Sequence, residues 1–348
     1  ADGFEWRADG IDTPFYEIRW NANGQLERIY DKTYGRDVLA PGARGNVLQV
    51  FEDKPMQFDA WNIDLYYQEK MRTVQDLSSV TLIERGPLRA VVAFEWTYMD
   101  STIRQELHLF AKRRRIDFRT AVDWREQHQL LKAAFPVDIR AAEATYDIQY
   151  GNVKRPTHWN TSWDYARFET VGHQWADLSE RGYGVSLLND CKYGYDIKDN
   201  VMRISLIKSA TYPDPNADQG AHAFTYSLLP HGGDWAAGGT VEEAWDLNDP
   251  AKATAGAALR ERFSLLRVSA ANIAIDAVKK AEDGDGIIVR FHEFEGRRGP
   301  VTIDSDLTIV SWQETDLMER PIEDARTGPL ECMVKPYEIK TFFVRFRS

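Results

Sequence analysis

The chain has 348 residues, of which 43% are hydrophobic and 28% charged. This balance is typical of a soluble globular protein and excludes a disordered chain, and no apolar run approaches the roughly 18 residues of a membrane-spanning helix. The 43 Lys and Arg against 54 Asp and Glu give a net charge of -11, which argues against nucleic acid as a partner. The length favours two domains.

The cysteines and the first residues predict a reducing, cytoplasmic location. Cys191 and Cys332 are far apart in sequence and form no CxxC pair, so the sequence predicts neither a disulfide framework nor a structural zinc site. The seven histidines also lack the spacings that commonly place two ligands on one metal ion. The opening ADGFEWRADG lacks the basic and apolar regions of a signal peptide, so export is not expected.

Period-two alternation predicts strands along most of the chain. A first hairpin is expected from Tyr16 to Tyr30, with its turn at Asn23-Gly24. Alternating apolar residues predict another strand over 88–98, followed by a strand, hairpin, strand unit over 103–124. We interpret the basic AKRRR stretch, residues 111–115, as a solvated hairpin tip rather than a binding patch.

The domain organisation follows from the one segment whose composition differs from its surroundings. Residues 254–266 have the only helical propensity we find and are interpreted as a connector. The sequence therefore predicts a large β domain over 1–262 and a small β-sandwich over 263–348, where short strands alternate with Gly- and Asp-rich turns. The fold class is all-β.

Two loops mix aromatic and polar residues in the way that sugar-binding loops do. They are FDAWNIDLYY (58–67) and RPTHWNTSWDYARFE (155–169), and their candidate substrate-binding residues are Asp59, Trp61, Trp163 and Asp164. An aromatic face covers the C–H side of a pyranose, while carboxylates and amides bind its hydroxyls. The alternative is that these aromatic residues belong to the core, as most Trp and Tyr of a β protein do.

A second group of polar residues follows two predicted strands. The stretch LLNDCKYGYDIKDN (187–200) offers Asn189, Asp190, Lys192 and Tyr193 directly after an apolar run. The next strand, from Met202 to Ile207, leads into Lys208 and a proline-stiffened loop that contains Asp214. The two loops form either a functional rim or ordinary turns, and residue chemistry alone leaves both open.

These motifs resemble the C-terminal β region of glycoside hydrolase family 38 α-mannosidases, in particular the cytosolic and bacterial branch. The resemblance begins from WADLSERGYGVSLLNDCKYGYDIKDN, within 175–235, and covers nearly the whole chain. Its other segments contain YDKTYGRDVLAPGARGNVLQVFEDKP, LLKAAFPVDIR, RPTHWNTSWDYARFE, KKAEDGDGIIVRFHE, ETDLMERP and KPYEIKTFFVRF.

The resemblance implies a large supersandwich similar to galactose mutarotase, followed by a small immunoglobulin-like sandwich. It also implies that the catalytic machinery lies elsewhere, because the family's nucleophile and divalent metal, zinc or cobalt, belong to an N-terminal (β/α) barrel that is followed by a helical domain. We therefore expect a C-terminal portion that is inactive alone, holds no catalytic residue and no metal, and acts on terminal α-mannosides only with those missing partners. The uncovered surface is expected to allow a homo-oligomer.

By the matching motif, Asn189, Asp190, Lys192, Tyr193 and Lys208 are expected to form the far wall of the mannoside pocket. The family often has arginine where Lys208 stands, so a bidentate grip is replaced by a single ammonium. Two alternatives remain: a free-standing carbohydrate-binding module, and a mutarotase-like sugar enzyme with its own acid and base. The second would use, for example, His158 or His231 with Asp164 or Glu169.

Overall fold

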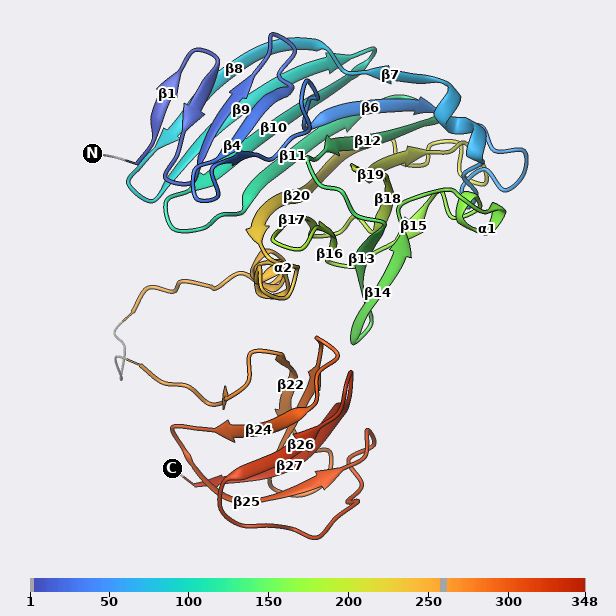
Figure 1. Ribbon diagram of the computed structural model, residues 1–348. Coiled ribbons are helices and arrows are strands. Elements are labelled where there is room, and N and C mark those ends of the chain that lie inside the picture. The colour runs from blue at the N-terminus through green and yellow to red at the C-terminus, as the bar shows by residue number, and fades with distance from the viewer. Residues whose placement is uncertain (1–2, 257–261, 348) are drawn as a thin grey trace. The chain divides into compact units, whose positions relative to one another are not determined.

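The computed structural model describes residues 3–256 and 262–347, which are mostly strands joined by short turns (Figure 1). The chain divides into two compact units, Ala1–Asp147 with Lys154–Ala251 and Ile148–Val153 with Lys252–Ser348. The helices are short: a 3-10 helix η1 (Leu65–Glu69), α1 (Ser162–Tyr165) and α2 (Thr240–Asn248). No helix of the described part of the chain is both long and apolar enough to cross a membrane.

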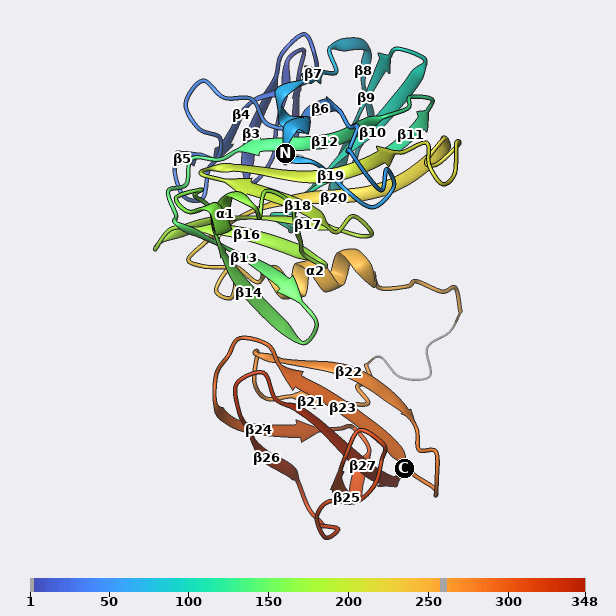
Figure 2. The same cartoon turned by 90° about the vertical axis from the view of Figure 1, so that its right-hand side faces the viewer.

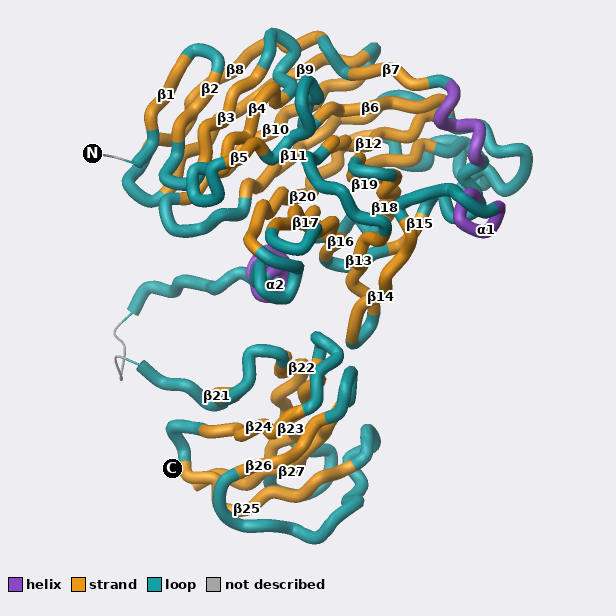
Figure 3. Tube along the Cα trace, viewed as in Figure 1, coloured by secondary structure: helices purple, strands orange, loops and turns teal. Residues whose placement is uncertain are grey.

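The large unit contains three sheets, whose strands are shown in Figure 3. The nine-stranded sheet consists, in spatial order, of β14 (Gly151–Pro156), β13 (Glu143–Ile148), β16 (Trp175–Ser179), β17 (Tyr183–Asn189), β20 (Gly220–Gly232), β11 (Ile116–Trp124), β10 (Ser101–Phe110), β9 (Arg89–Tyr98) and β8 (Asp76–Arg85). The six-stranded sheet consists of β15 (Thr170–Val171), β18 (Gly194–Lys198), β19 (Val201–Ser209), β12 (Gln129–Pro136), β6 (Val47–Glu52) and β7 (Met71–Thr73). The five-stranded sheet consists of β1 (Glu5–Arg7), β2 (Gly10–Asp12), β3 (Tyr16–Trp20), β4 (Leu26–Asp31) and β5 (Arg36–Asp37).

The strands follow the alternation of the sequence. In β3 every second side chain is buried, and its turn into β4 places Gly24 at φ 75°, which glycine adopts without strain. The strands β9, β10 and β11 pair antiparallel, with Ile103 of β10 opposite Trp96 on one side and Val122 on the other. The first hairpin and the strands predicted over 88–124 are confirmed.

Aromatic contacts join the sheets into two layers. Phe135 of β12 lies with its ring centroid 5.5 Å from that of Phe118 on β11, so the six-stranded sheet packs on the nine-stranded one. Trp20 of β3 packs edge-on against Phe94 of β9 at 5.2 Å, which places the five-stranded sheet on the same face. This arrangement confirms the predicted supersandwich.

The small unit is the predicted β-sandwich. Its three-stranded sheet consists of β21 (Arg267–Val268), β24 (Gly299–Asp304) and β26 (Leu330–Val334), and its four-stranded sheet of β22 (Ile273–Lys280), β23 (Ile287–Glu293), β27 (Ile339–Arg347) and β25 (Thr308–Thr315). Its core is centred on Trp312 and Phe342, whose rings meet edge-on at 5.7 Å, with Val289, Val301 and Leu330 around them.

The described residues of the connector do not form the predicted helix. Residues 257–261 lie outside the described part, and the flanking residues 254–256 and 262–266 are not helical. The helix before the connector is instead α2, which the sequence analysis did not predict. The division of domains at residues 262 and 263 stays a prediction.

The core contact of Phe135 can be tested by truncation. Phe135→Ala should lower the free energy of unfolding by about 3–5 kcal/mol, because it leaves a cavity between two sheets. Phe58→Ala is the control, since Phe58 is 61% exposed, and should change stability by less than about 0.5 kcal/mol. Denaturant unfolding followed by tryptophan fluorescence reports the large unit, because ten of the 11 tryptophans precede residue 252. Equal losses in both variants would contradict the packing.

Candidate functional site

The rim is the end of the large unit at which β6 and β19 end and β12 begins. Gln129 at the start of β12 pairs with Glu52 on one side and Ser209 on the other. The residues that follow or precede these positions therefore lie side by side. They include Asp53, His128 and Lys208, and the loops that leave the rim are 53–70, 190–193 and 210–219.

Lys208 and Asp53 form an ion pair at the rim. The Asp53 side chain is 1% exposed and that of Lys208 is 18% exposed. Burial raises the pKa of Asp53, although the Lys208 ammonium opposes that shift. The second carboxylate oxygen of Asp53, Oδ1, is buried and accepts no hydrogen bond from any described residue. The rim therefore holds a partly exposed lysine whose ammonium is paired with a buried carboxylate.

Asp59 fixes the 53–70 loop to the loop after β19. Its Oδ2 accepts hydrogen bonds from the backbone N–H of Thr211 at 2.7 Å, from that of Tyr212 at 3.2 Å and from the Thr211 hydroxyl at 3.2 Å. His128 completes the contact, with Nε2 3.1 Å from the Thr211 hydroxyl. Burial alone would raise the pKa of Asp59. These hydrogen bonds stabilise the ionised carboxylate more than burial destabilises it, so the pKa of Asp59 is lowered. The predicted site residue Asp59 thus orders two loops.

Large aromatic side chains project from these ordered loops into solvent. Phe58 is 61% exposed, Trp61 67% and Tyr212 67%, and Trp163 in α1 is 76% exposed. Phe58 has φ 58°, a left-handed conformation that a bulky residue adopts only under constraint. Of the predicted residues, Trp61 and Trp163 are therefore accessible to a ligand or a partner, and they are not part of the core.

The 189–193 segment is only partly accessible. Asn189 is fully buried: its amide nitrogen donates to the His173 carbonyl at 2.7 Å and to the Tyr195 hydroxyl at 2.6 Å, and its amide oxygen accepts from the Lys192 N–H at 2.7 Å. Its polar atoms thus hold the segment together. Tyr193 is 49% exposed.

The other predicted site residues differ in their contacts. Asp190 accepts a hydrogen bond from the Thr225 N–H at 3.0 Å, and Lys192 lies 4.8 Å over the Phe224 ring. Asp164 caps α1 through Thr161, and Asp214 accepts from the Asn216 N–H at 2.9 Å within its own turn. The structure brings Asp59 and Lys208 to one rim, whereas Asp164 and Trp163 lie on a separate segment.

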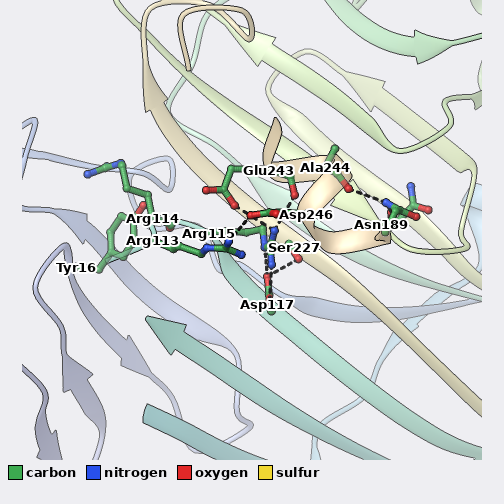
Figure 4. Close-up of polar contacts among 11 residues, drawn as sticks. Tyr16, Arg113, Arg114, Arg115, Asp117, Asn189, Ser227, Glu243, Ala244 and Asp246 are labelled. Carbon is green, nitrogen blue, oxygen red and sulfur yellow. Dashed lines mark hydrogen bonds and ion pairs between the residues drawn. The ribbon is translucent and has the colours of Figure 1, made fainter. Parts of the chain in front are cut away.

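The helix α2 lies beside Asn189 of the 189–193 segment (Figure 4). Asn248, its last residue, donates to the Asn189 carbonyl at 2.9 Å. At its other end Arg115 binds the Glu243 carbonyl at 2.7 Å and the Asp117 carboxylate at 2.6 Å. Arg115 is 4% exposed, so the interpretation of the basic stretch as a solvated tip is wrong for this residue. The stretch is instead the anchor of α2.

A buried ion cluster was missed by the sequence analysis. The Lys132 side chain is fully buried and pairs with Glu169 and, at 2.5 Å, with Asp196. The Tyr67 hydroxyl donates to Glu169 at 2.5 Å, and Arg203 donates to Asp196 at 2.7 Å. Burial alone would lower the pKa of Lys132, but the carboxylates of Asp196 and Glu169 outweigh it, and the pKa is raised. The one available signal was a lysine inside the apolar run LLKAAFP.

The fold places the chain in the class of all-β proteins that consist of a supersandwich followed by a small sandwich. Residues 11–216 match the glycosyl hydrolases family 38 C-terminal domain, and residues 272–342 match the family 38 C-terminal beta sandwich domain. The chain belongs to glycosyl hydrolase family 38, as a C-terminal β portion.

Curated relatives carry the same family relationship. The chain is 35% identical to alpha-mannosidase G of Dictyostelium discoideum over 350 residues, covering 95% of this chain and 32% of the relative. It is 35% identical to human alpha-mannosidase 2C1 over 318 residues, covering 89% of this chain and 31% of the relative. The chain thus spans about a third of the length of these relatives.

A solved structure shares the fold. The crystal structure of an alpha-mannosidase from Enterococcus faecalis V583 superposes with a TM-score of 0.76 at 18% identity, covering 96% of this chain and 42% of the other. The match confirms the predicted fold class across both units.

The Asp59 contacts predict a pH-dependent stability. Asp59→Asn removes the carboxylate but not the shape, so it should lower Tm at pH 7, where the wild-type carboxylate is ionised. Because the folded-state pKa is lowered, the carboxylate stabilises the fold above its unfolded pKa of about 3.9, and that stability disappears as the pH falls through the folded-state pKa. The Tm difference between the two proteins should therefore shrink in acid.

Thermal unfolding between pH 7 and pH 3 measures this difference. Asp214→Asn is the matched control, because the Asp214 carboxylate caps an exposed turn, and it should have little effect on Tm at any of these pH values. A Tm difference for Asp59→Asn that stays constant down to pH 3 would show that its ionised carboxylate does not hold the loops.

Proposed function

We propose that the chain is the non-catalytic C-terminal β portion of a retaining, metal-dependent α-mannosidase, and that it completes a mannoside-binding centre with an N-terminal catalytic barrel. The observation that carries this proposal is the coverage: the relatives named as α-mannosidases match this chain over only about a third of their length. The remaining two thirds can supply the catalytic barrel and the helical domain. The proposal includes a cytoplasmic location, which the two free cysteines support.

The rim supplies the groups that such a centre needs from a second wall. The Lys208 ammonium is partly exposed, and one of its three N–H donors binds the buried carboxylate of Asp53. Trp61 and Tyr212 offer exposed aromatic faces on loops that Asp59 holds in place. A charged donor beside exposed aromatic faces suits the hydroxyls and the C–H face of a mannoside.

The divalent metal of the family, zinc or cobalt, is assigned to the missing region. Among residues 3–256 and 262–347, no three His, Cys, Asp or Glu side chains converge as a metal site requires. The described residues therefore offer no ligand set for that ion.

The alternative of an independent sugar enzyme has less support from its candidate acids and bases. His231 and Asp177 contact each other at 2.8 Å, but both side chains are 2% exposed, so His231 cannot reach a sugar. Glu169 is bound to Lys132. His158 lies 3.5 Å from Asp164 on the separate α1 segment, where Asp164 already caps the helix.

The alternative of a free-standing carbohydrate-binding module rests on the exposure of Trp61 and Trp163. Calorimetric titration of the 348-residue chain with mannobiose separates it from our proposal. Micromolar binding by this chain alone favours the module, because a completed binding centre needs both walls. Weak or absent binding favours the incomplete centre.

Activity provides the direct test of the proposed function. The chain alone should not hydrolyse an aryl α-mannoside in the presence of zinc, cobalt or manganese, and hydrolysis should appear when the N-terminal barrel and helical domain are supplied, either in the same polypeptide or by co-expression. Turnover by this chain alone would refute the assignment.

The role of Lys208 in substrate binding can be tested once this chain is active together with its N-terminal catalytic region. Lys208→Met should lower kcat/KM at least ~10-fold, because a hydrogen bond from a charged donor to the substrate is lost. Lys208→Arg should retain most activity, since it keeps the charge and the ion pair with Asp53. Lys54→Met, at an exposed lysine of the 53–70 loop, is the control and should behave as wild type. Full activity of Lys208→Met would remove Lys208 from the site.

A further inference from the structure

A small cavity of about 10 Å³ lies between β14, β18 and the segment that follows α1. These elements belong to the same side of the large unit (Figure 2). The cavity has room for about one water-sized particle. The side chains that define its chemistry are Tyr146, Arg155, Trp159, Arg167, Asp196 and Lys198.

The cations around this cavity have no carboxylate of their own. Arg155, Arg167 and Lys198 form no ion pair within 4.0 Å with any carboxylate of the described residues. Arg155 donates one N–H to the Val171 carbonyl at 2.8 Å, and Lys198 lies 3.9 Å over the Trp159 ring. The guanidinium and ammonium groups are therefore held in place without being neutralised.

The one carboxylate in the wall is already neutralised. Asp196 accepts from Arg203 at 2.7 Å with Oδ1 and from Lys132 at 2.5 Å with Oδ2. The Arg and Lys side chains of the lining are donors only, and the hydroxyls of Tyr146 and Thr170 add groups that can also donate.

The charge balance around the cavity is strongly positive. Its lining holds three cations, Arg155, Arg167 and Lys198, and one carboxylate, Asp196, which is paired with Lys132 and Arg203 outside the lining. Burial, together with the charge of Arg167, lowers the pKa of Arg155, as expected of a guanidinium that lacks a counter-ion.

We propose that this cavity binds a small inorganic anion of the size of chloride, held by Arg155, Arg167 and Lys198. Arginine suits this role because its guanidinium is weakly hydrated and offers several N–H donors in a fixed plane. The bound anion joins β14, β18 and the segment after α1, and so stabilises the part of the chain from which Trp163 projects. The site is independent of the proposed mannosidase function.

Salt-dependent thermal unfolding of the 348-residue chain tests the site. At constant ionic strength, replacing methanesulfonate by chloride should raise Tm by about 2–4 °C at a concentration near 10 times Kd. Arg155→Gln should show no such rise. Arg181→Gln is the matched control, because Arg181 is an exposed arginine that also forms no ion pair with a described residue, and it should show the wild-type rise.

Bromide locates the anion directly and does not depend on a variant that folds. Crystals of the unaltered chain grown in bromide should show an anomalous peak within hydrogen-bond distance of the Arg155 guanidinium. A cavity without such a peak, or a chloride effect of equal size in Arg155→Gln, would overturn the proposal. A larger rise in Tm with sulfate than with chloride would also overturn it, since the cavity has no room for that ion.

Discussion

The buried ammonium of Lys132 is the interaction on which the candidate site depends. A charged group that is fully buried is unfavourable unless it is paired and hydrogen-bonded, and the sheet that carries Lys132 supplies only one carboxylate, Asp196. The second, Glu169, comes from the segment after α1. The sheet therefore needs that segment on its outer face.

This requirement brings together parts of the chain that are far apart in sequence. Tyr67 of η1 donates to the same carboxylate, and its ring packs against Phe51 of β6 at 5.0 Å, so the 53–70 loop is held on the same face. The aromatic side chains of Trp61 and Trp163 are exposed on the two segments that the cluster fixes. The 53–70 loop and the segment after α1 are thus both fixed to the six-stranded sheet.

The architecture was predictable because it follows from local pattern. Alternation over 88–124 and the Asn23-Gly24 turn specify strands and a hairpin whatever surrounds them, and the structure has both. The helix α2 was not predictable in this way. It has only nine residues and depends on Arg113 and Arg115, whose partners Asp246 and Glu243 lie more than 100 residues away in sequence.

The sequence predicted which residues lie in the loops of the candidate site, but not which of them are exposed and which are buried. Residue type indicated that Asp59, Trp61 and Lys208 would lie in functional loops, and all three are at the rim or on its loops. It could not show that Asn189 would be fully buried, because that depends on how the strands and loops around it pack. Lys132 was overlooked for the same reason, since a lysine in a strand is normally solvated.

Hydrogen exchange on Lys132→Ala tests the central constraint most directly. The variant leaves Glu169 and Asp196 without the ammonium between them, so amide protection should fall together in residues 60–70 and 160–170, while the strands of the small unit stay protected. Lys54→Ala, at an exposed lysine of the same loop, should leave both segments as in the wild type. Unchanged protection in both segments of Lys132→Ala would contradict the account.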